Sequence, residues 1–249
     1  MKLRLLTFVA FLGAFLSTSA QENVTYQKPS SEILALADYE RAPSVSMDTK
    51  KEYMLLSYRN TYKTLDDLNQ EEMKLGGLRI NPVTNISSTV TYINNLKVRK
   101  IKDKAEIQVK GLPENARITN VSWSPNEKKI AFTNTTNKGV ELWVLDVVSA
   151  TAKKLTADNL NANLGNPFNW MKDNETLLVK VLPKDRPALI NSAKDLPKEP
   201  TVSLSDGSKS QNRTYQDLLK NKTDEANFDA LVTSELYKVS LSGNTTLFK

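Results

Sequence analysis

The sequence predicts an all-β protein, a partial β-propeller of about three four-stranded antiparallel blades with short helical insertions. Residues 118–156 contain four short segments with strand character, separated by turns. The motif that opens this stretch recurs twice elsewhere in the chain. The 249 residues include no cysteine, so the fold must depend on core burial and not on disulfides.

The stretch 118–156 has the size and pattern of one propeller blade. Apolar and polar residues alternate along three segments, at Val121 and Trp123, at Ile130 and Phe132, and at Val140, Leu142 and Val144. Ser124-Pro125-Asn126-Glu127 predicts a turn, in which Pro125 fixes φ and Asn126 tolerates left-handed geometry. We expect residues 134–139 to form a polar loop and residues 152–156 to form the fourth strand.

The same motif begins two further blades. Met47, Trp123 and Trp170 act as anchors, each followed by a polar turn and, seven residues later, by Met54, Ile130 and Leu177 respectively. An internal repeat is stronger support than any single strand assignment. The predicted blades cover about 43–112, 117–157 and 167–249.

Two blades are predicted to carry insertions. In the first, Thr64 caps a helix containing Leu65, Leu68, Met73 and Leu75, which ends at Gly76-Gly77, before strands at 89–93 and 105–109. In the third, the insertion covers 183–232, with a surface loop over 183–213, a capping pattern at Thr214 for a helix through Leu218 and Leu219, and a second helix at 224–232. A hairpin of residues 236–241 and 245–248 then completes the blade.

The first twenty residues have the features of a secretory signal peptide. Lys2 and Arg4 precede an apolar run from Leu5 to Leu16 and the small residues 17–20, with cleavage expected before Gln21. The apolar run is short for a transmembrane helix, although an uncleaved anchor is the alternative. We therefore expect an exported protein, periplasmic or extracellular and without a membrane segment after cleavage. Residues 21–42 form an N-terminal arm, with a short helix beginning near Pro29.

The charge pattern gives no sign of nucleic-acid binding. The net charge of +6 falls to +4 once Lys2 and Arg4 are removed. The one dense basic run has no interleaved aromatic residues, and it comprises Lys97, Arg99, Lys100, Lys102 and Lys104. We interpret this run as a solvated strand edge.

Catalytic and cofactor-binding motifs are missing from the sequence. Without histidine or cysteine the chain cannot assemble a Ser-His-Asp or Cys-His system, and it has no Gly-x-Ser-x-Gly elbow, phosphate-cradling loop or EF-hand. We assign no catalytic, cofactor-binding or metal-binding residue, and expect no cofactor and no activity from this chain alone.

Several weaker candidates have more ordinary explanations. The adjacent carboxylates Asp66-Asp67, Glu71-Glu72 and Asp224-Glu225 point apart on a helix and suggest solvated faces. Trp123, Trp143 and Trp170 could stack on a ligand, but the repeat favours core packing for the first and third. Arg59, Arg79 and Arg186 could bind a carboxylate, although surface solvation is the simpler interpretation. Asn-x-Ser/Thr sequons occur at Asn23, Asn85, Asn120, Asn134, Asn174, Asn221 and Asn244.

Several segments together resemble the N-terminal region of glutamyl endopeptidase-like serine peptidases of the prolyl oligopeptidase group. The more specific ones are Leu78-Arg-Ile-Asn-Pro82 and Arg213-Thr-Tyr-Gln-Asp-Leu-Leu219, and they are supported by 26–33, 43–46, 121–125 and 141–146. The resemblance covers nearly all of the chain after residue 20. It implies a propeller followed by an α/β-hydrolase domain, which carries the triad while the propeller shields the site and selects short peptides.

Two hypotheses follow. In the first, the chain is the non-catalytic propeller portion of such an exported peptidase and gates peptide access to a hydrolase domain, its partner in cis, whose catalytic segments are not found in this sequence. In the second, the chain is a stand-alone exported module that binds a protein or peptide.

Overall fold

A computed structural model of the chain describes residues 28–191, 207 and 216–248. The predicted signal peptide, Asn23, Thr214 and most of the 183–213 loop lie outside these residues. The chain divides into two compact units, Met1–Tyr39 and Glu40–Lys249. In the first unit, α2 (Ser31–Ala37) forms where the Pro29-Ser30-Ser31-Glu32 motif predicts a helix start, and none of its residues is buried.

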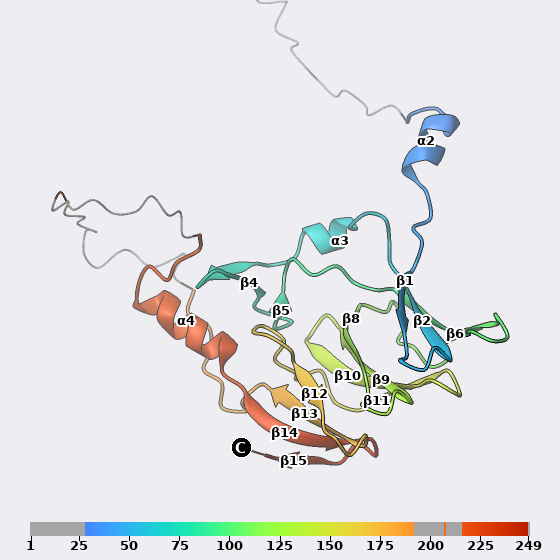
Figure 1. The fold of residues 1–249 in the computed structure, drawn as a ribbon. Coiled ribbons are helices and arrows are strands. Elements are labelled where there is room, and N and C mark those ends of the chain that lie inside the picture. The colour runs from blue at the N-terminus through green and yellow to red at the C-terminus, as the bar shows by residue number, and fades with distance from the viewer. Residues whose placement is uncertain (1–27, 192–206, 208–215, 249) are drawn as a thin grey trace, which may run out of the picture. The chain divides into compact units, whose positions relative to one another are not determined.

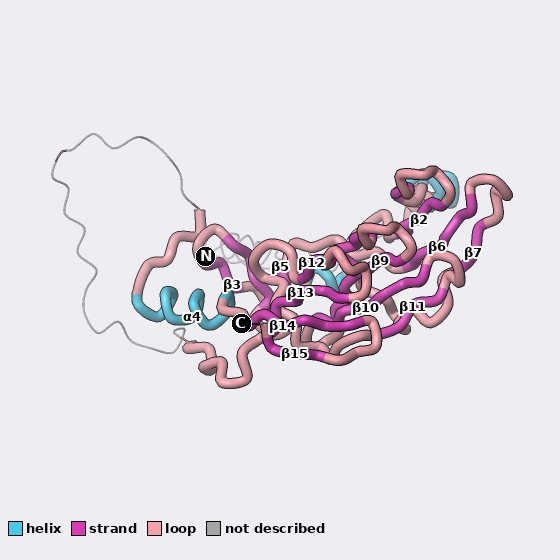
Figure 2. Tube along the Cα trace, turned by 60° about the horizontal axis from the view of Figure 1, so that its bottom comes forward, coloured by secondary structure: helices cyan, strands magenta, loops and turns pink. Residues whose placement is uncertain are grey.

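Three four-stranded antiparallel sheets dominate the second unit, and we call them blades 1, 2 and 3 (Figures 1 and 2). Blade 1 contains β1 (Ser44–Met47), β2 (Tyr53–Tyr58), β6 (Asn95–Lys100) and β7 (Glu106–Gln108). Blade 2 contains β8 (Ile118–Trp123), β9 (Lys129–Thr135), β10 (Val140–Asp146) and β11 (Thr151–Lys154). Blade 3 contains β12 (Phe168–Trp170), β13 (Thr176–Val181), β14 (Glu235–Ser240) and β15 (Thr245–Leu247). The predicted fold class is confirmed.

The three anchors occupy equivalent positions in the sheets. Met47 pairs with Met54, Trp123 with Ile130 and Trp170 with Leu177, each across the first two strands of its blade. Directly opposed residues of an antiparallel pair share one face of the sheet. The seven-residue spacing therefore places the anchor and its partner on the same face in every blade.

The turns after the anchors also repeat, but the left-handed residue is not the one expected. Lys51, Glu127 and Asn174, four residues after their anchors, have φ of 57°, 59° and 63°. In blade 2 the expected residue was Asn126. The turn places its last residue in the left-handed region, as a type I turn followed by a left-handed residue does. The Asn126 side chain instead accepts hydrogen bonds from the Ser124 hydroxyl (2.9 Å) and the Lys128 N–H (3.1 Å).

Blade 2 is apolar on both faces because it lies between the other two blades (Figure 2). Ile130, Phe132 and Leu145 join one core cluster with Leu55 and Val98 of blade 1. The alternate residues of blade 2, among them Ala131, Leu142 and Val144, join a second cluster with Leu177 and Val179 of blade 3. Strand alternation thus divides one sheet between two cores.

Each anchor tryptophan contacts the blade before its own. Trp123 donates its indole N–H to Ser46 Oγ of blade 1 at 2.8 Å, and Trp170 donates to the Ser122 carbonyl of blade 2 at 3.1 Å. Ser46 and Ser122 both immediately precede the anchors of their own blades. Both tryptophans are half-buried and pack against the core clusters, so the expected core packing is confirmed, with an inter-blade hydrogen bond in addition.

The turns after the anchors form a second set of contacts between neighbouring blades. Thr49 donates its backbone N–H and its hydroxyl to the Glu127 carboxylate, at 3.0 and 2.7 Å. Asn126 donates its N–H to Asn174 Oδ1 at 2.7 Å. In both cases the left-handed residue of one blade accepts from the turn of the preceding blade. We refer to the indole and turn bonds together as the inter-blade contacts.

The insertion in blade 1 differs from the prediction. The helix α3 covers only Leu65–Leu68, and Met73–Leu75 form strand β3, paired with β4 (Leu78–Asn81). Gly76 and Gly77 both have positive φ, so they form a hairpin turn and not a helix end. Strand β5 (Ile86–Ser87) completes this three-stranded sheet.

Two further assignments from the sequence are wrong. Residues 89–93 contribute one isolated bridge, Ile93 to Ile118, and the third strand of blade 1 is β6. The basic run therefore begins on an inner strand, where Leu96 and Val98 are buried while Lys97 and Arg99 approach Glu106 of β7 on the opposite face. No helix forms at Leu218 and Leu219; α4 (Lys222–Val232) begins after the Asn221 cap and confirms the second predicted helix.

The insertions of blades 1 and 3 pack against each other. Leu75, Ile80 and Leu231 form a small buried cluster, against which Phe228 packs. Asn161 Nδ2 donates to the Leu231 and Thr233 carbonyls at 2.9 Å, which fastens the end of α4 to the connection between blades 2 and 3. Figure 1 shows α4 and β4 on the same side of the blades.

Candidate functional site

The candidate site is a polar cavity of about 750 Å³ beside blade 1. Its walls come from the end of β2 and the loop that follows, from α3, from residues 90–95 and from the connection between blades 1 and 2. Four basic residues (Arg41, Arg59, Lys63 and Arg117) and two acidic ones (Asp66 and Asp67) line it, which leaves an excess of two positive charges.

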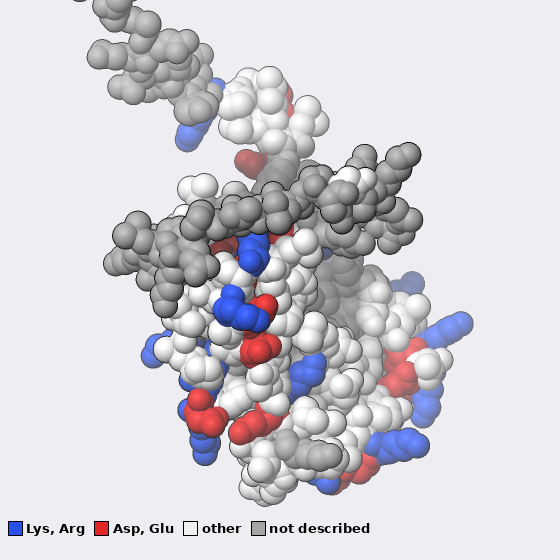
Figure 3. Space-filling model, turned by 90° about the vertical axis from the view of Figure 1, so that its left-hand side faces the viewer, with Lys and Arg blue, Asp and Glu red and all other residues white. Residues whose placement is uncertain are grey.

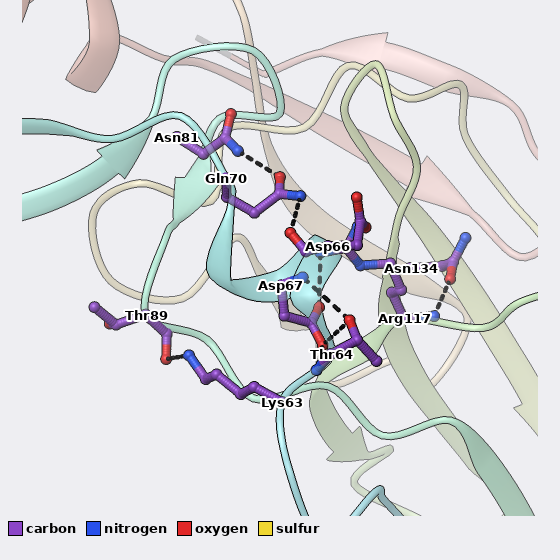
Figure 4. A network of polar contacts seen from close by, with 9 residues as sticks. All are labelled: Lys63, Thr64, Asp66, Asp67, Gln70, Asn81, Thr89, Arg117 and Asn134. Carbon is purple, nitrogen blue, oxygen red and sulfur yellow. Dashed lines mark hydrogen bonds and ion pairs between the residues drawn. The ribbon is translucent and has the colours of Figure 1, made fainter. Parts of the chain in front are cut away.

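Arg117 connects the helix α3 to blade 2. Its Nη1 lies 3.4 Å from Asp66 and its Nη2 lies 3.3 Å from Asp67, while its guanidinium lies 4.3 Å from the centre of the Tyr92 ring. The pair with Asp67 is better shielded than an ordinary surface ion pair, because Arg117 and Asp67 are only 19% and 22% exposed, whereas Asp66 is 78% exposed. Figure 4 shows the two carboxylates on the side of α3 that faces Arg117.

A capping box fixes the position of these carboxylates. The Asp67 N–H donates to Thr64 Oγ1, and the Thr64 N–H donates to the Asp67 carboxylate, both at 3.1 Å. Gln70 donates to the Asp66 carbonyl at 2.8 Å and accepts from Asn81 at 3.0 Å (Figure 4). A helix of four residues is therefore held by its cap and by its neighbours.

The polar contacts continue from Arg117 into blade 2. The Arg117 N–H donates to Asn134 Oδ1 at 3.0 Å, and Asn134 Nδ2 donates to Glu141 at 3.2 Å. Glu141 is buried, and it also accepts from the Trp143 indole (2.8 Å) and from Lys154 (3.2 Å). Hydrogen bonds to residues of blade 2 therefore hold this part of the cavity wall in place.

Arg59 is a half-buried basic residue of the cavity wall. Its Nε is buried without a hydrogen-bond partner, and no ion pair to Arg59 forms within the described part of the chain. A guanidinium without an acidic partner, in a cavity with excess positive charge, is suited to binding a carboxylate. The neighbouring amides are bonded to one another: Asn94 Nδ2 donates to Asn60 Oδ1 at 2.6 Å, and Asn95 Nδ2 donates to Gln108 Oε1 at 3.1 Å.

The two acidic residues of the cavity are both held by one arginine. The chain has no histidine or cysteine, and the two cavity carboxylates are both paired with Arg117. Among the residues described, no three His, Cys, Asp or Glu side chains gather in a way that could hold a metal ion.

The structure separates the other candidates from this cavity. Arg79 lies 3.4 Å from Glu72, and Arg186 donates to Asn85 Oδ1 at 2.6 Å, so both serve the packed insertions. Burial lowers the pKa of Arg186. The hydroxyl of Ser88 is the main cause of a lowered pKa at Glu72, with Arg79 and Lys74 adding to it. Asp224 accepts from the Lys220 N–H, and Glu225 pairs with Lys222.

Two of the sequons, those at Asn85 and Asn134, have buried asparagines. Glycosylation requires an accessible amide, so neither side chain can carry a glycan in this fold. Trp143 stacks on Phe132, with ring centroids 6.3 Å apart, and so takes part in packing.

Sequence reasoning missed Arg117, Asn134 and Glu141. Arg117 precedes β8 without a motif of its own, and residues 134–139 were expected to be a polar loop, although β9 continues to Thr135. The one available signal was the adjacent pair Asp66-Asp67, which follows a capping threonine. Two neighbouring carboxylates are favoured where a cation lies close by.

Three successive four-stranded antiparallel blades define a propeller-type fold. No protein-family model matches the chain. The chain is 33% identical over 233 residues to a probable chloroplastic glutamyl endopeptidase of rice, and 31% identical over 237 residues to the corresponding protein of Arabidopsis thaliana. Each match includes 88% of this chain and 24% of the relative.

The chain is therefore a relative of glutamyl endopeptidase-like proteins, as its motifs indicated, and it spans about a quarter of the length of the curated relatives it matches. Among solved structures, an acylaminoacyl peptidase of Pyrococcus horikoshii aligns with 86% of this chain and 25% of its own, at 15% identity and a TM-score of 0.39.

Proposed function

We propose that the chain is a non-catalytic propeller portion of an exported serine peptidase of the prolyl oligopeptidase type, and that it controls the access of peptides to an α/β-hydrolase domain. The observation that carries this proposal is the identity of 31–33% to glutamyl endopeptidase-like proteins across 88% of the chain. The three blades and the absence of histidine from the sequence agree with a shielding role, in which the hydrolase domain supplies nucleophile and base.

A chimera tests this role. The segment of the rice relative that aligns with this chain is replaced by residues 21–249, and hydrolysis of a short peptide is compared with hydrolysis of an unfolded protein such as casein. We expect the chimera to cleave the short peptide and to discriminate against the protein, whereas the relative with the segment deleted discriminates less. Equal discrimination with and without the segment would refute gating. Substitution of the relative's nucleophilic serine controls for contaminating proteases.

Export is part of the proposal and needs its own test. It is motivated by the basic, apolar and small-residue pattern of residues 1–20, which lie outside the described residues. No helix in the part of the chain that is described has the length and apolar character needed to span a bilayer. N-terminal sequencing of the secreted or periplasmic protein should begin at Gln21; recovery of an intact Met1 from the cytoplasm contradicts export.

The cavity favours a second candidate function, that of a stand-alone module that binds acidic peptides. The supporting observation is the unpaired Arg59 among excess positive charge. Isothermal titration with a short acidic peptide tests it. Arg59→Gln should weaken binding about tenfold, which corresponds to loss of one charge-assisted contact of about 1.4 kcal/mol. Arg79→Gln, which alters a paired arginine outside the cavity, is the matched control. Binding that is unchanged by Arg59→Gln counts against this function.

A further inference from the structure

Each blade has two ends, and the connections between its strands alternate between them. The turns after the first and third strands lie at one end, which we call the turn end, because neighbouring strands run antiparallel. The cavity lies at the other end, since its walls include the end of β2 and the loop that follows. The chain also enters blade 1 from the cavity end, where Ser44 pairs with Ser57. The turn end of blade 1 is therefore opposite both the cavity and the entering chain.

Lysines gather at the turn end of blade 1. The turn between β1 and β2 lies beside the turn between β6 and β7, because the Ile101 N–H donates to the Glu52 carbonyl at 2.9 Å. Together the two turns contain four exposed lysines that form no ion pair within the described part of the chain, and these are Lys50, Lys51, Lys102 and Lys104.

Nearby acidic residues cancel only part of this charge. Glu52 and Asp103 lie in or beside the same turns, and Asp103 is already paired with Lys100 at 3.0 Å. Residues 50–52 and 100–104 contain five lysines and two carboxylates, which leaves an excess of three positive charges. The neighbouring turn of blade 2 contains one charge of each sign, Glu127 and Lys128, so the excess is local to blade 1.

The other two blades show that the turns can form without these lysines. The turns after the third strands of blades 2 and 3, residues 147–150 and 241–244, contain no charged residue. The first turn of blade 3 places Lys172 beside Asp173 and Glu175, so positive charge does not accumulate there. Figure 3 shows basic and acidic side chains interspersed with uncharged surface on the side of the molecule that includes blade 3. The excess charge of blade 1 is therefore not a requirement of the fold.

The four lysines lie on projecting turns and not in a pocket. Figure 2 shows the loop that joins β6 and β7 projecting beyond blade 1, on the side away from blade 3. None of the four lysines lines the candidate site or the two smaller cavities, of about 280 and 330 Å³, in the described part of the chain. Each ammonium is a compact hydrated charge on a flexible stem, without the planar geometry by which arginine holds one carboxylate or phosphate. Such a set suits an extended anionic surface better than a single small anion.

We propose that the turn end of blade 1 docks the protein on an anionic membrane surface. The lysines of the two turns contact lipid headgroups, no segment crosses the bilayer, and the cavity end stays open to solution. Such a surface attracts every lysine that lies within about one Debye length of it. Val148, which is 65% exposed in the adjoining turn of blade 2, offers an apolar contact at the same end, because the Val147 N–H donates to the Lys128 carbonyl at 3.1 Å.

This inference goes beyond the proposed function and takes from it only the export that exposes the protein to a membrane surface. Its test measures vesicle binding and neither peptidase activity nor processing, so the two proposals can fail separately. Residues 21–249 are used, because the apolar run between Leu5 and Leu16 would bind lipid by itself. All three blades belong to the unit Glu40–Lys249, which this removal leaves intact.

Co-sedimentation at low salt compares vesicles of phosphatidylcholine with vesicles that also contain phosphatidylglycerol. Each lysine near an anionic surface strengthens binding about fivefold, so an excess of three charges should favour the anionic vesicles about 100-fold. High salt should remove this preference by screening. Lys50→Gln combined with Lys102→Gln removes one lysine from each turn and should weaken binding to the anionic vesicles about 25-fold.

The matched control carries Lys138→Gln and Lys184→Gln. These exposed lysines follow the second strands of blades 2 and 3, so the control loses the same charge at the cavity end. It should bind anionic vesicles within about twofold of the parent, and equal melting temperatures confirm that all three proteins are folded. Equal binding of the parent and the turn-end variant, or equal losses in the two variants, overturns the proposal. Binding to polyglutamate without binding to vesicles would identify an acidic protein as the partner and also refute it.

Discussion

Removing the indole N–H of Trp170 should loosen blade 3 from blade 2. Trp170→Phe keeps an aromatic ring against the second core cluster but loses the 3.1 Å bond to the Ser122 carbonyl. The bond contributes about 1 kcal/mol, and the smaller ring buries roughly 30 Å² less apolar surface, worth about 0.75 kcal/mol. The sum lowers the melting temperature by about 3–8 °C for a chain of this length.

Thermal melting followed by circular dichroism measures this change, with urea unfolding as a check that the transition stays cooperative. Met47→Phe is the matched control, because Met47 is the anchor that contacts no preceding blade, and its substitution should shift the melting temperature by less than about 2 °C. If Trp170→Phe behaves like Met47→Phe, the reasoning about inter-blade hydrogen bonds is wrong.

Three further predictions concern the insertions, the cavity wall and the loss of stability at acidic pH. Gly76→Ala should destabilise the protein by about 1–2 kcal/mol more than Gly77→Ala, as measured by urea unfolding. Both glycines have positive φ, but a Cβ at Gly76 would lie 2.9 Å from the Phe228 ring, whereas a Cβ at Gly77 would meet open space. Equal losses would show that the backbone conformation alone decides the effect. Arg117→Met should cost about 1–2 kcal/mol in the free energy of unfolding, because it leaves the mostly buried Asp67 carboxylate without its cation, while Asp66 stays solvated. Arg79→Met, at an exposed ion pair, should cost less than about 1 kcal/mol, and similar losses would contradict a special role for Arg117. Burial raises the pKa of Asp146, but the N–H and hydroxyl of Ser149 and the ammonium of Lys129 outweigh it and hold the pKa below the ordinary 3.8. This carboxylate therefore stabilises the fold above pH 4 and loses that effect as the pH falls through its folded pKa. The Asp146→Asn variant should lose less stability than the parent protein between pH 5 and pH 3. Equal losses of stability in the two proteins would exclude Asp146 as a contributor.

The blades could be predicted because their signals are local and repeated. The seven-residue spacing from Met47, Trp123 and Trp170 is a consequence of a short hairpin between paired strands, and the structure pairs those very residues. The closing hairpin and α4 were likewise visible in alternation and capping residues.

The errors arose where local propensity and long-range packing disagree. Met73 and Leu75 fit a helical pattern after Thr64, but Gly76-Gly77 at positive φ and the cluster with Leu231, more than 150 residues away, favour a strand. The cavity wall was invisible for the same reason. Arg117 meets Asp66 and Asp67 from about 50 residues away, and only the folded chain brings these groups together.

The central claim is that successive blades are joined by equivalent contacts that run in one direction along the chain. Amide hydrogen exchange, resolved residue by residue by NMR, tests it most directly, because the turn donors of the three blades are compared in one molecule. We predict that the N–H groups of Thr49 and Asn126 are protected and that the N–H of Lys172 exchanges freely in the chain of 249 residues. Equal exchange at all three positions would contradict the account.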